Sequence, residues 1–166
     1  MRGYCYFHIG IEHSQIVDTS DFKLFNKKII PSVQPTHATS DMYWVKDRIG
    51  SSRMEGAYSY KRLLKESGSI VLGTDFPVED VSPILTFYAA ISRKDVNGYP
   101  EDGFNFENAL SREEALRGMT IWAAKANFEE KEKGSKGWSG TALGKRRKIG
   151  GGGEGWVDVR EGRTNL

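Results

Sequence analysis

Three residues that could do chemistry each follow a short apolar stretch of this sequence: His13, His37 and Asp75. Imidazole nitrogens and carboxylate oxygens bind Zn²⁺, and the same groups act as general acids and bases. His13 and Asp75 both come directly after a predicted strand. If these strands are parallel, both side chains lie at one edge of the sheet. A His and an Asp at that edge predict a metal site or an acid–base pair.

Asp75 has the clearest sequence context. The apolar run Ile70–Leu72 predicts a short strand buried on both faces, and Gly73 and Pro77 end it. A carboxylate directly after a buried strand is costly unless a metal ion or a proton donor pairs with it. The alternative is that Asp75 caps the turn or the next helix.

The two histidines have alternative interpretations. His13 is either a metal ligand or a hydrogen-bonded histidine of the core. His37 lies in a polar stretch, 36–42, which predicts a loop after the second strand, so it could face the same edge of the sheet. It either contacts a substrate or has no ligand. Glu12 and Glu79 are adjacent and could orient the candidates. One His and one Asp are too few for a closed metal site.

The elements that must position these residues alternate along the chain. The patterns predict strands at 8–15, 29–35 and 70–72. They predict helices at 18–25, 51–67 and 83–91, and from Ser111 onward, where Ser111 and Glu114 form a capping box. The stretch 94–108 is a polar loop. Strands that alternate with helices predict an α/β fold with parallel strands.

The composition limits the class of protein. The chain has 166 residues, of which 38% are hydrophobic and 28% charged, which is typical of one globular domain. No run approaches 18 apolar residues, so we expect no transmembrane helix. Cys5 is the single cysteine, which excludes an intrachain disulfide and fits a cytoplasmic protein.

The composition changes abruptly near residue 135. Residues 136–166 contain seven Lys and Arg against three Asp and Glu, and nine of the 19 glycines. Such a segment cannot bury enough apolar surface to order itself, so we expect a disordered tail after a domain at 1–135. The cluster Lys145–Lys148 could contact nucleic acid, but short basic clusters are common in tails, so we do not expect this partner.

Four motifs resemble a known family. Ile11–Gln15, Val33–Met42, Gly73–Glu79 and Leu110–Leu116 occur in this order. Together they closely resemble the C-terminal part of type-3 amidohydrolases, the branch that includes enzymes like N-substituted formamide deformylase. The resemblance covers roughly residues 9–135. It identifies the chain as a C-terminal fragment of such an enzyme.

The resemblance implies a fold and an activity. The family fold is a metal-dependent (β/α)8 TIM barrel, of which this chain would supply about strands 6 to 8. The implied reaction is hydrolysis of a non-peptide carbon–nitrogen bond of a small-molecule amide by metal-activated water. His13 and Asp75 would bind a divalent metal, zinc by preference, although this fragment alone would bind it weakly or not at all. Asp75 would also be the catalytic base, and His37 would bind substrate.

The resemblance also implies that much is missing. A complete barrel needs roughly 250 residues, so this part is incomplete and we expect the isolated chain to be inactive. Its open sheet edge could associate into an oligomer. After Ser135 the family pattern stops, which suggests a shifted reading frame for 136–166. The alternative functions are a non-catalytic remnant or interaction module, or nucleic-acid association through the tail.

Overall fold

The computed structural model describes residues 8–134, 147–148 and 156–157. The chain divides into two compact units, Met1–Gly134 and Ser135–Leu166. Within the second unit, β4 (Arg147–Lys148) pairs antiparallel with β5 (Trp156–Val157). The rest of the predicted disordered tail, and Cys5, lie outside the described residues, so these predictions stay open.

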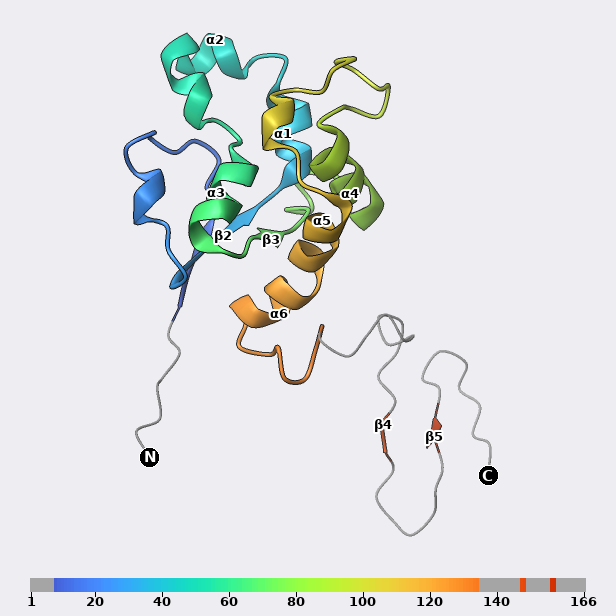
Figure 1. The fold of residues 1–166 in the computed structure, drawn as a ribbon. Coiled ribbons are helices and arrows are strands. Elements are labelled where there is room, and N and C mark those ends of the chain that lie inside the picture. The colour runs from blue at the N-terminus through green and yellow to red at the C-terminus, as the bar shows by residue number, and fades with distance from the viewer. Residues whose placement is uncertain (1–7, 135–146, 149–155, 158–166) are drawn as a thin grey trace. The chain divides into compact units, whose positions relative to one another are not determined.

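The first unit is built on a three-stranded parallel sheet in the order β1–β2–β3 (Figure 1). Its strands are β1 (Ile9–Glu12), β2 (Ile29–Val33) and β3 (Val71–Leu72). Ile9 pairs with Ile29, and Ser32 pairs with Val71. The predicted parallel strands are therefore confirmed, and their carboxyl ends share one edge of the sheet.

Short helices connect these strands, and several pack against them. Contacts join α3 to β2, α5 and α6 to β3, and α1 to α4. In chain order the helices are η1 (Phe22–Leu24), α1 (Pro35–Asp41), α2 (Val45–Ile49), η2 (Ser51–Gly56), α3 (Tyr60–Ser67), α4 (Pro83–Ser92), η3 (Phe106–Asn108), α5 (Arg112–Met119) and α6 (Ile121–Ala126).

One predicted loop is wrong. The stretch 36–42 lies almost entirely in α1, which begins at Pro35. Proline suits the first position of a helix because its fixed φ matches the helix and its missing N–H would have had no partner there. The first five residues of α1 are buried. His37 therefore lies in the first turn of a helix, where its position is fixed more firmly than in a loop.

Two predicted helices are shorter than their patterns suggested. The stretch 51–67 divides into η2 and α3, because Tyr58 between them has a φ of 50° and cannot continue a helix. The stretch 18–25 contains only the single turn η1. The helix predicted from Ser111 is interrupted at Thr120, which separates α5 from α6.

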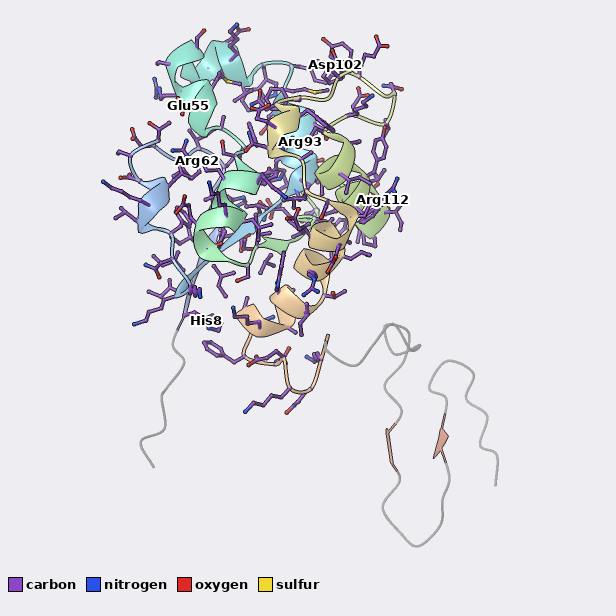
Figure 2. The ribbon with its side chains drawn as sticks, in the orientation of Figure 1. His8, Glu55, Arg62, Arg93, Asp102 and Arg112 are labelled. Atoms are coloured by element: carbon purple, nitrogen blue, oxygen red, sulfur yellow. The ribbon has the colours of Figure 1, made fainter. Side chains whose placement is uncertain are left out.

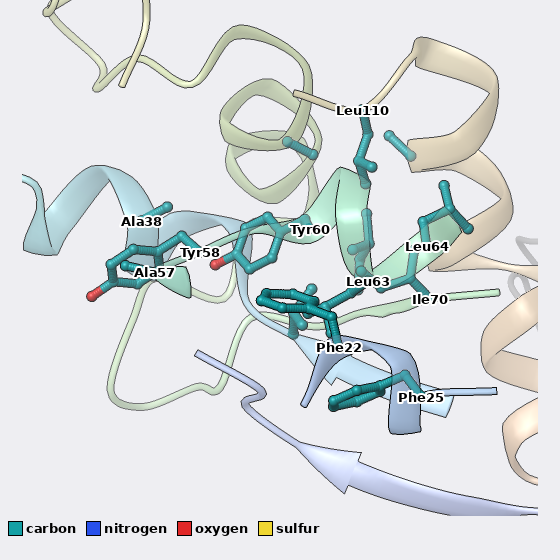
Figure 3. Close-up of a cluster of buried hydrophobic side chains, with 14 of the residues drawn as sticks. Phe22, Phe25, Ala38, Ala57, Tyr58, Tyr60, Leu63, Leu64, Ile70 and Leu110 are labelled. Carbon is teal, nitrogen blue, oxygen red and sulfur yellow. The ribbon is translucent and has the colours of Figure 1, made fainter. Parts of the chain in front are cut away.

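The core lies between the sheet and the helices and is rich in aromatic residues (Figure 3). Phe22, Tyr60, Leu63 and Ile70 are each no more than 1% exposed. Arg93, at the end of α4, is also fully buried (Figure 2). Its guanidinium carbon lies 5.0 Å from the centre of the Tyr60 ring, and burial lowers the pKa of Arg93.

The predicted capping box at the start of α5 is confirmed. Ser111 Oγ accepts a hydrogen bond from the Glu114 backbone N–H, and the Glu114 carboxylate accepts one from the Ser111 N–H. Lys61 on α3 lies 2.6 Å from the same carboxylate. Burial acts to raise the pKa of Glu114, but the bonds from Lys61 and Ser111 outweigh it and the pKa is lowered.

Substituting Glu114→Gln is expected to reduce the free energy of unfolding by about 1 kcal/mol at neutral pH. Because the folded-state pKa is lowered, the contribution of the Glu114 charge is present above its ordinary pKa of 4.5 and is lost as the pH falls through the lowered value. Urea unfolding between pH 3 and pH 7 measures this effect. The free energy of unfolding should fall less steeply toward acid pH in the variant than in the unmodified chain. Glu113→Gln, an exposed neighbour that pairs with Arg117, is the control and should change stability by less than about 0.5 kcal/mol. Equal effects of the two substitutions would contradict the prediction.

Candidate metal centre

Three strand ends bring the candidate residues together. His13 directly follows β1, His37 lies in the first turn after β2, and Asp75 comes three residues after β3. One ligand atom of each side chain lies within 4.8 Å of the others. The prediction that His13 and Asp75 share one edge of the sheet is therefore confirmed. His37, which could face the same edge from its position after the second strand, belongs to the same group.

The contact between His37 and Asp75 has the spacing of two ligands of one ion. His37 Nε2 lies 3.6 Å from Asp75 Oδ2. This nitrogen is buried and has no hydrogen-bond partner among the described residues, which is costly for a polar atom. Two ligands about 2.1 Å from a tetrahedral zinc lie about 3.4 Å apart. The buried nitrogen and the carboxylate therefore fit a divalent ion.

His13 presents one of its two ring nitrogens to the same place. Its Nδ1 lies 3.0 Å from Gln34 Oε1, so Nε2 is the nitrogen left for a ligand. The rings of His13 and His37 are stacked, with their centres 5.7 Å apart and their planes inclined by 12°. The exposed His13 and the buried His37 thus reach the site from two neighbouring strands.

The backbone on both sides of the site is strained. His13 has a φ of 64° and Asp75 a φ of 57°, in the left-handed region that residues other than glycine seldom adopt. Ser14, with a φ of 40°, anchors the turn after β1 by donating from Oγ to the Ile11 carbonyl. Such strain is found preferentially at functional sites, where the surrounding structure holds it.

The interpretation of Asp75 as a cap is wrong. Ser82 occupies the N-cap position of α4. In the turn after β3, the Phe76 N–H bonds Thr74 Oγ1, and the Val78 N–H bonds the Asp75 backbone carbonyl. Within residues 8–134 the Asp75 carboxylate accepts no backbone hydrogen bond and instead faces His37.

The sequence reasoning missed a polar network beside the site. Tyr58 Oη donates to Asp41 Oδ2 at 2.6 Å, and Gln15 Nε2 donates to the same oxygen at 2.8 Å. Burial, followed by the bond to Asp41, raises the pKa of Tyr58. Asp41 lies four residues after His37, so the two side chains share a face once 35–41 is helical. The polar sequence of this stretch does not indicate a helix, which is why the network was missed.

Glu12 and Glu79, the two residues predicted to orient the candidates, differ in their contacts. Glu12 Oε1 accepts hydrogen bonds from Gln34 and Ser32, next to His13. Glu79 makes no hydrogen bond or ion pair within the part of the chain that the structure describes. A role for Glu12 beside the site therefore has structural support, whereas Glu79 has none.

Comparison with known proteins agrees with this geometry. The model of the amidohydrolase family matches residues 3–135. The chain belongs to the amidohydrolase family. It is 30% identical over 128 residues to the putative amidohydrolase YtcJ of Bacillus subtilis (strain 168), and 31% identical over 131 residues to the protein LONG AFTER FAR-RED 3 of Arabidopsis thaliana. The resemblance stated from the motifs is thus confirmed.

Two solved structures are similar to this amidohydrolase chain. Both are uncharacterized metal-dependent hydrolases, one from Pyrococcus furiosus (TM-score 0.62, 29% identity) and one from Pyrococcus horikoshii OT3 (TM-score 0.66, 28% identity). They match 75% and 78% of this chain but only 25% and 26% of their own chains. The two curated relatives are matched over 24% and 21% of their length, and over 76% and 75% of this chain. The chain therefore spans about a quarter of the length of its relatives.

The helices of the structure bear on the prediction of no transmembrane helix. Among the helices of the described residues, none combines the length and the apolar character needed to cross a bilayer.

Proposed function

We propose that this chain is the C-terminal part of a metal-dependent hydrolase that cleaves a carbon–nitrogen bond other than a peptide bond. In this proposal residues 8–134 form about strands 6 to 8 of a (β/α)8 barrel. Membership of the amidohydrolase family and the likeness to metal-dependent hydrolases support it. The observation that carries it is the unpartnered, buried His37 Nε2, 3.6 Å from Asp75 and beside His13.

The proposed ligands are His13 Nε2, His37 Nε2 and Asp75 Oδ2. A catalytic zinc site has three protein ligands and one open position, and two imidazoles with one carboxylate are such a set. The family resemblance assigned His37 to the substrate instead. We prefer a metal ligand, because a substrate contact would not need the nitrogen to lie so close to Asp75 in a buried position.

A bound divalent ion would supply Lewis-acid activation of water and of the amide carbonyl. Asp75 would accept the proton of the water as its oxygen attacks the carbonyl carbon. Asp75 would then return that proton to the departing nitrogen, so that the carbon–nitrogen bond breaks and the products are a carboxylic acid and an amine. His13 and His37 would hold the ion in place during these transfers. The substrate would be a small-molecule amide.

The isolated chain is expected to be inactive, because three strands cannot enclose a substrate. A non-catalytic interaction module is the second candidate function. Two observations favour it: all four residues of β1 are exposed, and a groove of about 660 Å³ lies beside this strand. An exposed strand edge is a template for pairing with another chain.

Zinc titration by calorimetry tests the metal proposal. The chain is expected to bind one zinc ion, and His13→Ala and His37→Ala should each weaken binding at least about 100-fold, more than the loss of an orienting residue costs. His8→Ala is the control, because His8 stacks on Phe128 rather than on the site. Failure of the chain to bind zinc would contradict the proposal. If His37→Ala binds zinc with unchanged affinity, His37 is not a metal ligand, and the substrate-binding role implied by the family resemblance would be preferred.

A further inference from the structure

Gln34 connects the two histidines of the proposed metal centre. It directly precedes α1 and is only 5% exposed. Its side-chain oxygen lies 3.0 Å from His13 Nδ1, and its backbone carbonyl accepts the His37 backbone N–H at 3.0 Å. Tyr60 Oη donates to the same carbonyl at 3.0 Å. One buried residue therefore touches both histidines.

Glu12 fixes which way the Gln34 amide points. Gln34 Nε2 lies 2.6 Å from Glu12 Oε1, which also accepts Ser32 Oγ at 2.9 Å. An ionised carboxylate can only accept hydrogen bonds, so the amide nitrogen must face Glu12. The opposite orientation would bring two acceptor oxygens together. The amide oxygen must therefore face His13.

This orientation decides where the proton of neutral His13 lies. The amide oxygen of Gln34 only accepts hydrogen bonds, so His13 Nδ1 must be the donor. His13 Nε2 then has no proton and presents its lone pair. A metal-binding imidazole needs this arrangement, and an outer hydrogen bond commonly sets it.

We propose that Glu12 and Gln34 are positioning residues that hold His13 in the Nδ1–H tautomer and aim its Nε2 lone pair at the metal position. The metal part of this inference rests on the proposed function. The tautomer part does not, because the hydrogen bonds exist without an ion. Gln34 also ties His13 to the start of α1, where His37 lies.

Nitrogen-15 NMR of the imidazoles in the metal-free chain tests the tautomer directly. Spectra at pH 8 would be assigned with single substitutions of the three histidines. The Nδ1–H form of His13 should predominate in the unmodified chain, and Gln34→Leu should lose it in favour of Nε2–H. The same variant should bind zinc about 10- to 100-fold more weakly, the usual cost of an orienting residue.

A swapped pair separates positioning from mere packing. In the double variant Glu12→Gln, Gln34→Glu, the carboxylate and the amide exchange places, and the carboxylate still accepts from Nδ1. In this double variant the Nδ1–H form of His13 should predominate again, and zinc affinity should return to that of the unmodified chain. A predominant Nε2–H form in the unmodified chain would overturn the inference, as would Gln34→Leu spectra identical to those of the unmodified chain. A tautomer shift without any zinc binding would contradict the proposed function and support the positioning role.

Discussion

Substituting Asp75→Asn is expected to weaken zinc binding at least about 100-fold and to reduce hydrolysis about 1,000-fold. The amide oxygen is a much poorer metal ligand than a carboxylate, and asparagine cannot accept the proton of the attacking water. The fold should be retained, because asparagine tolerates the left-handed backbone that residue 75 adopts, with a φ of 57°. Activity is therefore lost without loss of structure.

Two measurements check this prediction. Calorimetry measures zinc affinity in the chain itself. Turnover is measured in a chimera in which residues 9–134 replace the matching segment of YtcJ, with whichever of a panel of simple amides the otherwise unsubstituted chimera hydrolyses. Asp80→Asn is the control, because asparagine can still accept the Ser82 N–H at that position. If Asp75→Asn retains full zinc affinity, Asp75 is not a metal ligand. If it retains full turnover, Asp75 is not the catalytic base.

Substituting Gly56→Ala is expected to lower the free energy of unfolding by about 3 kcal/mol, at the upper end of the usual overpacking range. A Cβ atom on Gly56 would lie 1.9 Å from the Val17 carbonyl oxygen, which is backbone and cannot rotate away. The Val17 N–H donates to the Gly56 carbonyl, and the Tyr58 N–H donates to the Gln15 carbonyl. The substitution would push these paired segments apart.

The effect should reach the candidate metal centre, because the displaced segment begins just after His13. Chemical denaturation gives the stability change, and zinc titration of the folded fraction gives the effect on the site. Gly10→Ala is the matched control, since no atom of the described residues lies within 4 Å of the place where its Cβ would be. A loss below about 0.5 kcal/mol for Gly56→Ala would contradict the structure around Val17.

The sheet could be predicted from sequence because its strands are short, largely apolar runs with clear ends. Ile70–Leu72 and the run from Ile29 have this character, and alternation with helices implied parallel pairing. α1 was missed because its residues are small and polar and show no apolar period, while its burial comes from tertiary contacts with α4. Pro35 was read as the end of a strand, although it also begins a helix.

The candidate site could be predicted only in part, for a physical reason. Residues that follow strands share an edge once the strands are parallel, so His13 and Asp75 could be grouped in advance. The approach of His37 Nε2 to Asp75 depends on the start of α1, which the sequence did not show. The Glu12–Gln34 bond depends on the register between β1 and β2. All four residues of β1 are exposed, so β1 has no buried face that would specify this register in the sequence.

The three proposed metal ligands follow three separate strands, so a bound ion would cross-link the whole sheet. An ion that joins residues 13, 37 and 75 binds the native chain but not the unfolded one. Zinc at 100 times its dissociation constant would then add about 2.7 kcal/mol to the free energy of unfolding. Metal supply would set how long the chain survives proteolysis as well as whether the site can work.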